Sequence, residues 1–482
     1  KQFDIVIIGA GVVGCAIARE LARYDVRVAL LDKESDVAMG TSGRNSGVVH
    51  AGFNCATGAL KTGLCVEGCK RFGDYCAELG VPYKRTGKLV VAFNDDDVKV
   101  INKLKETGDR NGVLDLRIIG REEMEALQPH VGGIAAMHSP WTAVTSPYQL
   151  TIALAENAAA NGVEIFLETQ VLGIRKLKSG FNVRTNQGAF KTRYVINSAG
   201  LFADKVARMV GIKDYRIYPC RGEYFIMDKR VIGMLNMPIY PAPRAGEGGL
   251  GVHLTTSVDG NILIGPSAEY VNRREDYSTT RAVMDQLYKE ARELLPPIDR
   301  RDFIRDYAGV RPKLVGKTVG GFGDFVIEEV KSVPGFINLI GIESPGLTAA
   351  PMIAEMVAGI ISGKETMLKK ESFNPRRPAP VHFNELSEDE KARLIAEDPE
   401  YGEIVCRCEG ITLKEIKDAI NNPLGVKTVT GVKYRARAMM GRCQGGYCFT
   451  RITRLLMEHH QLEPEELTYS GKGSNLFVGR VK

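Results

Sequence analysis

The sequence has no uninterrupted apolar segment long enough to cross a membrane. Its most apolar long window, residues 337–362, contains Glu343, Pro345, Pro351 and Glu355, and such interruptions exclude a membrane span. The amino end also lacks the charged and apolar regions of a secretion signal, because a strand and a glycine turn begin at once in KQFDIVIIGAG. We therefore expect a cytoplasmic protein, or one held at a membrane surface only through a partner.

Cysteine and excess charge are also scarce. Ten cysteines in 482 residues are too few for a disulfide scaffold. The formal net charge of +6 is small and dispersed, which argues against nucleic-acid binding but suits an anionic small-molecule substrate. The length predicts two or three domains, one of them large.

The amino-terminal residues contain a dinucleotide-binding pattern. The apolar run FDIVIIG is followed by Gly9, Gly11 and Gly14, a helical pattern, and a second apolar run that ends on Asp32. Gly9 permits a tight turn, Gly11 lets the backbone approach a pyrophosphate, and Gly14 lets helix and strand pack closely. The helix N-terminus around Val13 faces the phosphates, and Asp32 is placed to bind a ribose diol. The pattern favours a dinucleotide-binding site over a glycine turn that only lets the helix pack on the strand and binds no ligand.

The loop after the second apolar run indicates which dinucleotide binds. TSGRNSGVVHAG at 41–52 is rich in small and hydroxylic residues, which suit a backbone pressed against an extended ligand. This loop, with the segments at 163–171 and 194–204, resembles the FAD-dependent D-amino-acid-oxidase-like superfamily. The resemblance implies FAD rather than NAD. It places these residues beside the cofactor: Thr41, Ser42, Ser46, Gly47, Val48, Val171, Ala199 and Gly200.

His50 lies in this loop and is one of only seven histidines. Imidazole titrates near neutral pH, so His50 is suited to take a hydroxyl proton while a hydride moves to the flavin. The alternative is a histidine that hydrogen-bonds the loop backbone and never meets a substrate. His253, in a hairpin predicted around an Asp-Gly turn, and Arg244 are further pocket candidates, each equally compatible with an ordinary strand or loop position.

Two later segments add candidate contacts. DYAGVRP offers Arg311 in a predicted turn, where a guanidinium can grip a phosphate or carboxylate, although an arginine beside proline is often a plain surface residue. ESPGLTAAP precedes an apolar helical run. Its Gly346 and Leu347 are predicted to receive the polar edge of a flavin at the helix N-terminus, and Ser344 to reach substrate. An ordinary helix cap is compatible with the same residues.

Four of the ten cysteines gather near the carboxyl end, as the pair Cys406 and Cys408 and the pair Cys443 and Cys448. Two close pairs predict a tetrathiolate metal site. Zinc ribbons typically use CxxC pairs, whereas the CRC pair resembles the [2Fe-2S] domain of bacterioferritin-associated ferredoxins. An iron-sulfur cluster is therefore favoured over zinc, and either is favoured over incidental thiols.

These patterns predict an α/β (α+β) protein with several parts. Residues 1–365 are expected to form an FAD domain with a parallel GxGxxG sheet and an interleaved antiparallel substrate lobe. Residues 366–403, rich in proline and charge, are expected to form a linker with one short helix. Residues 404–460 are expected to form a small helical cluster domain, and 461–482 a carboxy-terminal tail.

The motifs resemble more than one group of flavoenzymes over residues 1 to about 365. Glycerol-3-phosphate oxidases of the short type share TSxxNSGVxHxG, the element around Arg311, and SPGLTAAP. L-2-hydroxyglutarate dehydrogenases share NSGVxHAG, RGEY and the GVHLT hairpin. The flavin subunit of anaerobic glycerol-3-phosphate dehydrogenases resembles the chain in GRN, in YAGVRP, and also in CRCE and GRCQGGYC beyond residue 400, which favours glycerol 3-phosphate.

This resemblance implies oxidation of sn-glycerol 3-phosphate to dihydroxyacetone phosphate. It implies that His50 is the base, Arg311 the anion anchor and Ser344 a substrate contact, with FAD as hydride acceptor and a protein partner that takes electrons from the cluster. Short-type oxidases have a lysine before the hairpin, where this chain has GEGGLGVH, so Arg244 would have to replace it. Two alternatives stay open: a dehydrogenase of L-2-hydroxyglutarate or another 2-hydroxy or 2-amino acid, and an electron-transfer or redox-sensing flavoprotein without a substrate of its own.

Overall fold

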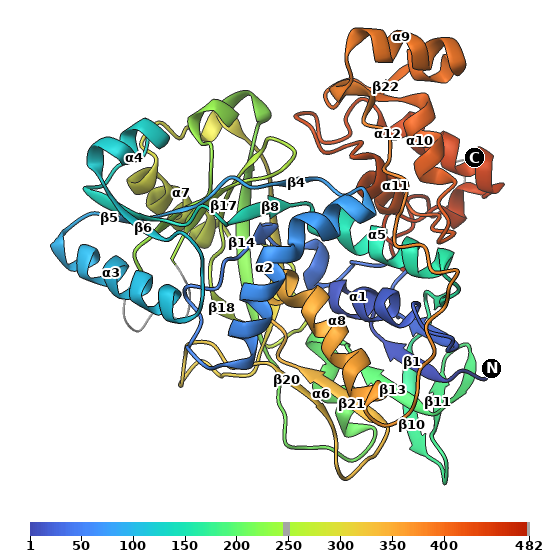
Figure 1. Ribbon diagram of the computed structural model, residues 1–482. Coiled ribbons are helices and arrows are strands. Elements are labelled where there is room, and N and C mark those ends of the chain that lie inside the picture. Colours follow the sequence, from blue (N-terminus) through green and yellow to red (C-terminus); the bar gives the residue numbers. More distant parts are fainter. Residues whose placement is uncertain (244–250, 480–482) are drawn as a thin grey trace.

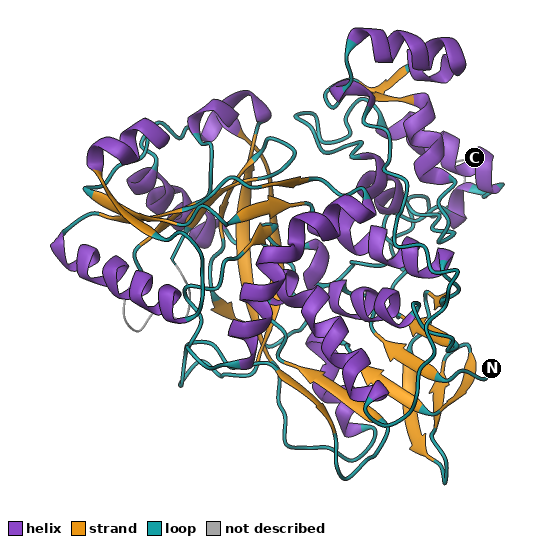
Figure 2. Ribbon diagram, in the orientation of Figure 1, coloured by secondary structure: helices purple, strands orange, loops and turns teal. Residues whose placement is uncertain are grey.

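The computed structural model describes residues 1–243 and 251–479. Arg244 lies outside the described residues. Figure 1 and Figure 2 show a strand-rich lobe on the left, a parallel sheet with helices on the right, and a small helical domain above them. This arrangement of helices and sheets confirms the predicted fold class.

The amino-terminal part is built on a mostly parallel sheet with β1 inside it. In spatial order its strands are β20 (Val326–Glu329), β21 (Phe336–Ile340), β13 (Tyr194–Asn197), β1 (Ile5–Ile8), β2 (Val28–Leu31) and β9 (Glu164–Phe166). The pair β20 and β21 is antiparallel, and the other neighbours run parallel. Every side chain of β1 and β2 is buried, as expected for apolar runs inside a covered parallel sheet.

Helices cover this sheet. One group packs together, with α1 between α5 and α8 and with α2 against α8. Their bounds are Val12–Leu21 for α1, Leu60–Leu79 for α2, Pro147–Ala160 for α5 and Gly346–Ser362 for α8. The short α6 (Ala203–Arg208) packs against β21 and β13. Smaller antiparallel sheets join β10 (Val171–Lys176), β11 (Phe181–Thr185) and β12 (Gly188–Thr192), and β3 (Val48–Val49), β8 (Ala143–Thr145) and β4 (Tyr83–Lys84).

The second lobe is a large sheet that is antiparallel except where β15 pairs with β5. In spatial order its strands are β18 (Glu269–Tyr270), β14 (Tyr218–Met227), β17 (Ile262–Gly265), β16 (His253–Thr256), β15 (Ile239–Pro241), β5 (Leu89–Ala92), β7 (Ala135–His138) and β6 (Arg117–Gly120). The helices α3 (Asp95–Arg110), α4 (Arg121–Leu127) and α7 (Arg281–Leu294) contact it. The pairing of β16 with β17 confirms the predicted hairpin.

Arg311 does not lie in the predicted turn. It belongs to β19 (Phe303–Lys313), which pairs along its length with β14 and places Arg311 opposite Cys220. The glycine and proline beside it resemble turn signals, but Gly309 serves a close approach of two backbones. A Cβ at Gly309 would lie 2.2 Å from the carbonyl oxygen of Arg44, so only glycine fits at this strand position.

The small domain contains β22 (Ile404–Cys406), β23 (Ile411–Thr412), α10 (Leu413–Ile420), α11 (Val429–Ala436) and α12 (Phe449–His460). These helices agree with the small helical domain that the sequence predicts at 404–460. Within the linker, α9 (Glu388–Glu397) forms with a complete capping box at Ser387. The segment after 460 is not a free tail over its described part, because Leu467 is fully buried in the core of the small domain.

Buried contacts fix the small domain on the flavin domain, above α5 in Figure 1. Arg435 of α11 donates from both terminal nitrogens to the buried carboxylate of Asp36, at 2.6 and 3.1 Å. The ring of Tyr434 stacks on Tyr148 of α5, with centroids 4.8 Å apart. Among the helices of the described chain, none has both the length and the apolar character that crossing a membrane requires.

The small domain also reaches the second lobe. Arg437 pairs with Asp259, at the turn of the β16–β17 hairpin, over 2.5 Å. Lys229 donates to Glu409 over 2.7 Å, and Glu409 directly follows Cys408. The segment that carries Cys406 and Cys408 is thereby held against the second lobe, while α11 holds the same domain on the flavin domain.

Replacing Arg435 by Met should weaken this docking, because the carboxylate of Asp36 would stay buried without its partner. Removal of one member of a buried pair costs about 3 to 5 kcal/mol. Thermal and urea unfolding should show an earlier transition for the small domain. The control is Arg451→Met, which removes an exposed pair with Glu403 and should cost less than about 1 kcal/mol. Equal losses in the two variants would contradict the assignment.

Candidate functional site

A cradle for a dinucleotide forms where β1 ends and α1 begins. Gly9 has a φ of +106°, and a Cβ there would lie 2.6 Å from the carbonyl oxygen of Ser198. A Cβ at Gly14 would lie 1.9 Å from the carbonyl oxygen of Gly9. Only glycine permits this turn and this packing of helix on strand. The N-cap residue Gly11 supplies no side-chain cap, and the N–H of Val12 donates to the hydroxyl of Ser42 at 2.9 Å. The N-terminal end of the helix, with its positive dipole, still faces the cavity and suits an anion.

Asp32 borders this cradle at the end of β2. Its carboxylate accepts hydrogen bonds from the backbone N–H of Ala10 at 2.6 Å and of Glu34 at 2.9 Å. Burial raises the pKa of Asp32 to about 6, against the effect of these two backbone donors. A carboxylate has about four acceptor positions, so Asp32 keeps acceptor capacity for a ribose hydroxyl beside the cradle.

A cavity of about 1580 Å³ extends from the cradle to the second lobe. It brings together most of the residues that the sequence predicts for the cofactor and the chemistry. Those that line it are Gly9, Gly11, Val13, Asp32, Thr41, Ser42, Ser46, Val48, His50, Val171, Ala199, Gly200, Arg311, Ser344, Gly346 and Leu347. Gly14 and Gly47 are not among its lining residues. A Cβ at Gly47 would lie 2.2 Å from the carbonyl oxygen of Thr145, so this glycine makes a close backbone contact.

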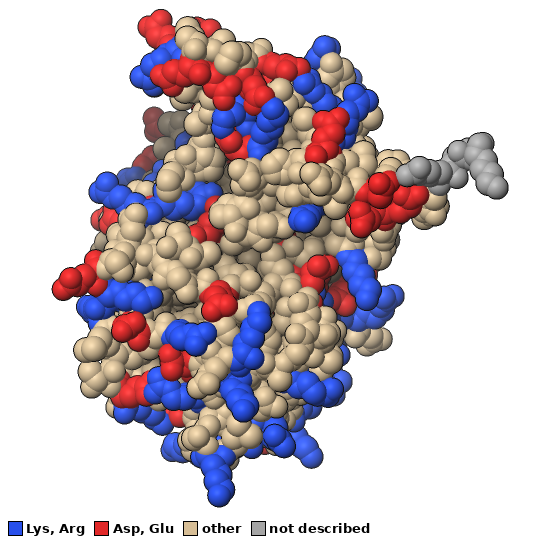
Figure 3. Space-filling model, turned by 90° about the vertical axis from the view of Figure 1, so that its right-hand side faces the viewer, with Lys and Arg blue, Asp and Glu red and all other residues tan. Residues whose placement is uncertain are grey.

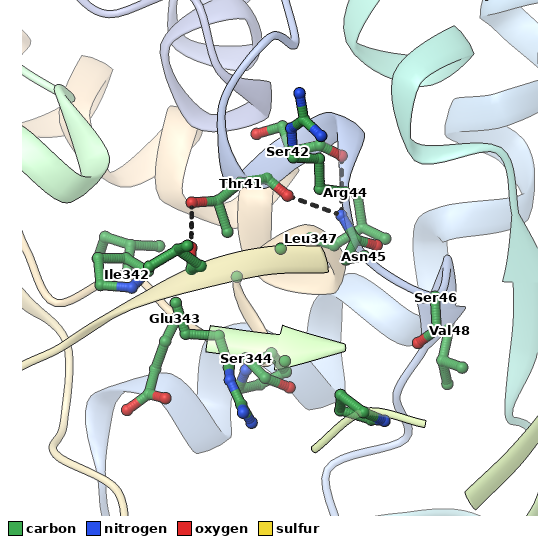
Figure 4. A pocket seen from close by; sticks show the side chains of 18 of the residues that line it. Thr41, Ser42, Arg44, Asn45, Ser46, Val48, Ile342, Glu343, Ser344 and Leu347 are labelled. Carbon is green, nitrogen blue, oxygen red and sulfur yellow. Dashed lines mark hydrogen bonds between the residues drawn. The ribbon is translucent and has the colours of Figure 1, made fainter. Parts of the chain in front are cut away.

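The loop at 41–48 has a fixed shape at the wall of this cavity. Thr41 donates from its hydroxyl to the carbonyl oxygen of Val310 at 2.7 Å, which ties the loop to β19. The side-chain amide of Asn45 donates to the backbone carbonyls of Ser42, at 2.8 Å, and Thr41, as the dashed lines in Figure 4 show. The same view shows Ser344 on the segment that faces this loop.

The two predicted histidines of the cavity are both neutral at neutral pH. Burial, with the nearby charge of Lys88, lowers the pKa of His50 well below its usual value. Burial lowers the pKa of His253 to about 3. The Nδ1–H of His253 donates to the carbonyl oxygen of Gly251 at 3.1 Å, and its ring stacks on Tyr240 with centroids 3.8 Å apart. Each imidazole therefore presents an unprotonated nitrogen that can accept a proton.

Arg311 is an anion-binding candidate inside this cavity. One terminal nitrogen donates to the carbonyl oxygen of Ser267 at 2.7 Å, whereas its buried Nε has no hydrogen-bond partner among the described residues. Glu343, one residue before Ser344, is buried and also lines the cavity. Its Oε2 lies 3.4 Å from the Nζ of Lys313. Burial raises the pKa of Glu343.

Sequence reasoning missed Lys88, Tyr240 and Glu343 as members of the site. Lys88 precedes the short apolar strand β5, and no motif surrounds it. Glu343 was noted only as an interruption of an apolar window. A charged residue beside an apolar run is a weak signal, since it equally marks an ordinary strand end. Only the folded sheet brings these three side chains to the cavity wall.

The four predicted cysteines meet at one place in the small domain. The Sγ atoms of Cys406 and Cys408 lie 4.0 Å apart, and those of Cys408 and Cys443 lie 3.6 Å apart. Cys448 contacts Cys406 by a hydrogen bond between the thiols. Among the described residues no three side chains of the usual ligand types converge on one position for a single ion. The contacts link the four sulfurs in the order Cys448, Cys406, Cys408 and Cys443, a group called the cysteine row below. Four cysteine thiolates are the ligand set of a [2Fe-2S] cluster.

Hydrogen-bond donors and positive charge surround this row. The backbone N–H of Tyr447 lowers the pKa of Cys443, and the Cys406 thiol, with the backbone N–H of Met439, lowers that of Cys448. Lys433 is 7% exposed, and burial lowers its pKa to about 7. It forms no ion pair within the described residues, so its charge is free to balance a thiolate cluster. Figure 3 shows acidic and basic side chains intermixed over the face of the molecule that it draws.

Comparison with known proteins identifies both parts. Residues 4–360 match the family model described as FAD dependent oxidoreductase. The chain belongs to this family. Residues 404–458 match the model described as BFD-like [2Fe-2S] binding domain. This FAD-dependent oxidoreductase thus has an FAD site, which the cradle and the long cavity fit, and a [2Fe-2S] site, which the four cysteines fit.

Several known proteins are similar to this oxidoreductase. A protein of Caloramator mitchellensis named glycerol 3-phosphate dehydrogenase is 42% identical over 100% of this chain and 99% of its own length. An L-2-hydroxyglutarate dehydrogenase of Indibacter alkaliphilus is 31% identical over 74% of this chain and 98% of its own length. The FAD-bound L-alpha-glycerophosphate oxidase structure from Mycoplasma pneumoniae is 29% identical, has a TM-score of 0.74, and covers 79% of this chain and 100% of its own.

Replacing Cys408 by Ser should deplete the cluster of this oxidoreductase, because one thiolate of the row is lost. We expect iron and acid-labile sulfide to fall well below those of the unaltered protein, with loss of the cluster's visible absorption, while flavin content stays the same. The control is Cys69→Ser, since the Cys69 thiol only donates to the carbonyl oxygen of Trp141. A full iron content in the Cys408 variant would show that this thiol is not a ligand.

Proposed function

We propose that the protein is a glycerol-3-phosphate dehydrogenase that oxidises sn-glycerol 3-phosphate to dihydroxyacetone phosphate. The observation that carries this proposal is the 42% identity to the Caloramator mitchellensis protein of that name over the entire chain. The L-2-hydroxyglutarate dehydrogenase of Indibacter alkaliphilus accounts for only 74% of the chain. Similarity over the whole length includes the [2Fe-2S] domain as well as the oxidoreductase domain.

The cavity supports oxidation of an anionic alcohol. His50, neutral at neutral pH, accepts the hydroxyl proton of the substrate. Arg311, which lines the cavity, binds the anionic group through its guanidinium. Ser344, on the facing segment, donates a hydrogen bond to a substrate oxygen. When bound, FAD supplies the acceptor for the hydride that leaves the carbinol carbon, and the carbon becomes a ketone.

The small domain supports transfer of the electrons to another protein. A [2Fe-2S] cluster carries electrons one at a time, and an oxygen-reducing flavin has no need of it. Cys408 and Cys443 are exposed whereas Cys406 and Cys448 are buried, which leaves one edge of the cluster open to a partner. We therefore propose a dehydrogenase with a protein electron acceptor, located in the cytoplasm or at a membrane surface through that acceptor.

Anaerobic titration of the purified protein tests this function. Glycerol 3-phosphate should bleach the flavin absorbance within one turnover and then reduce the cluster, followed by visible and electron paramagnetic resonance spectra. Fast bleaching by L-2-hydroxyglutarate with no response to glycerol 3-phosphate would transfer the proposal to hydroxy acids, which the RGEY and GVHLT elements favour. No bleaching by either compound or by a panel of 2-hydroxy and 2-amino acids would indicate an electron-transfer or redox-sensing role.

Replacing His50 by Gln should lower kcat at least a hundredfold, because general-base catalysis contributes about 10² to 10⁴ in rate. Because its pKa is lowered, the imidazole of His50 stays neutral at the usual pKa of histidine and somewhat below it. For the unaltered enzyme, we thus expect no loss of kcat/KM as the pH falls to about 6.5, the usual pKa of histidine, and a loss only at lower pH, as His50 gains a proton. Stopped-flow flavin reduction measures both effects.

His138→Gln is the matched control, since His138 lies on β7 beside Arg117 and does not line the cavity. It should leave flavin reduction within about twofold of the unaltered rate, an order-of-magnitude expectation for a group outside the site. An unchanged rate in the His50 variant would remove the base assignment whichever substrate is correct.

A further inference from the structure

Lys88 is a buried lysine that faces the cavity. It is 2% exposed, directly precedes β5, and lines the cavity wall. Its ammonium lies 3.8 Å from the ring centroid of Tyr240 and 4.6 Å from that of Phe53. The two rings hold the side chain in place and partly stabilise its charge.

No carboxylate balances the charge of Lys88 within the described residues. Burial lowers the pKa of Lys88 to about 7, and the groups that act against this effect are the thiols of Cys65 and Cys55. A buried ammonium without an anionic partner is costly. Lys313, equally buried, has Glu343 beside it.

Other cationic or potentially cationic groups surround the same space. The charge of Lys88 lowers the pKa of both His50 and His253, and Arg311 contributes to the lowering at His253. The geometry agrees: the ring of Tyr240 contacts both Lys88 and His253. His253 pairs in register with Gly265, two residues before Ser267, whose carbonyl accepts from Arg311. This part of the cavity wall thus carries Lys88, Arg311 and two neutral imidazoles. The carboxyl group of Glu343, which is paired with Lys313, also lines the cavity.

We propose that Lys88 and Arg311 together bind a substrate with two negative charges, each cation neutralising one of them. This inference rests on the proposed function for the position of the substrate, because His50 must meet the hydroxyl group between the two cations. A phosphate monoester supplies both charges on one group, and a dicarboxylate supplies them on two. Their shared chemistry is a dianion, and Lys88 discriminates against monoanionic and neutral alcohols.

The variant Lys88→Met keeps the apolar stem and removes the charge. We expect the flavin spectral change on titration with inorganic phosphate to need at least tenfold more phosphate than in the unaltered holoenzyme. The KM for glycerol 3-phosphate should rise at least tenfold with a much smaller change in kcat, the pattern of a lost binding interaction. The weak affinity for the neutral analogue glycerol should stay unchanged.

Lys61→Met is the matched control. Lys61 lines the same cavity and is also buried, but its ammonium donates to the carbonyl oxygen of Gly323 at 2.8 Å. Its charge acts on the nearby carboxyl group of Asp324, whose pKa it helps to lower. Its replacement should change phosphate affinity less than about twofold, an order-of-magnitude expectation for a cation that already has an anionic neighbour. Flavin content and thermal unfolding are measured for both variants. If Lys88→Met fails to retain flavin, Lys88→Gln is measured instead, with the same expected loss of affinity.

The outcomes separate this inference from the proposed function. If glycerol 3-phosphate does not reduce the flavin but the Lys88 variant binds L-2-hydroxyglutarate at least tenfold more weakly, the dianion is a dicarboxylate. In that case the proposed function fails and the role of Lys88 stands. If the variant binds phosphate, glycerol 3-phosphate and L-2-hydroxyglutarate as tightly as the unaltered protein, the inference is overturned even where glycerol 3-phosphate is the substrate.

Discussion

A buried charge is stable only when an opposite charge or a set of dipoles faces it. Between the domains the chain supplies both members itself. Asp36 meets Arg435, and Asp259 meets Arg437. If the small domain moved away, each pair would be separated and a charge would stay buried without its partner. These pairs therefore fix the position of the small domain above the flavin domain. The cysteine row is thereby held in one orientation relative to the cavity.

In two other places the same requirement is not met by the described residues. Lys88 and Arg311 line the cavity without an ion pair among the described residues, and Lys433 is buried beside the cysteine row. In the proposed function, the anionic substrate balances the charge in the cavity, and the cluster with its four cysteine thiolates balances the charge in the small domain. The unbalanced cations therefore coincide with the places where function occurs.

Motifs whose members are close in sequence were predictable. The glycines from Gly9 to Gly14 act on one turn and one helix end, and the hairpin of β16 and β17 depends on its own alternation and turn. Arg311 was misplaced in a turn because Gly309 and its neighbouring proline have the same appearance in a turn and in a strand. The contact that distinguishes them, between Gly309 and Arg44, joins segments far apart in the chain.

The sequence by itself determined the dinucleotide turn, the loop beside the flavin and the two cysteine pairs, because backbone geometry and ligand chemistry restrict these positions to a few residue types. It could not reveal Lys88, since burial and the absence of a counter-charge are properties of the surroundings and not of the residue. Only the tertiary structure brought β5 beside β15 and the hairpin. That assembly, with β19 carrying Arg311, decided which cations line the cavity.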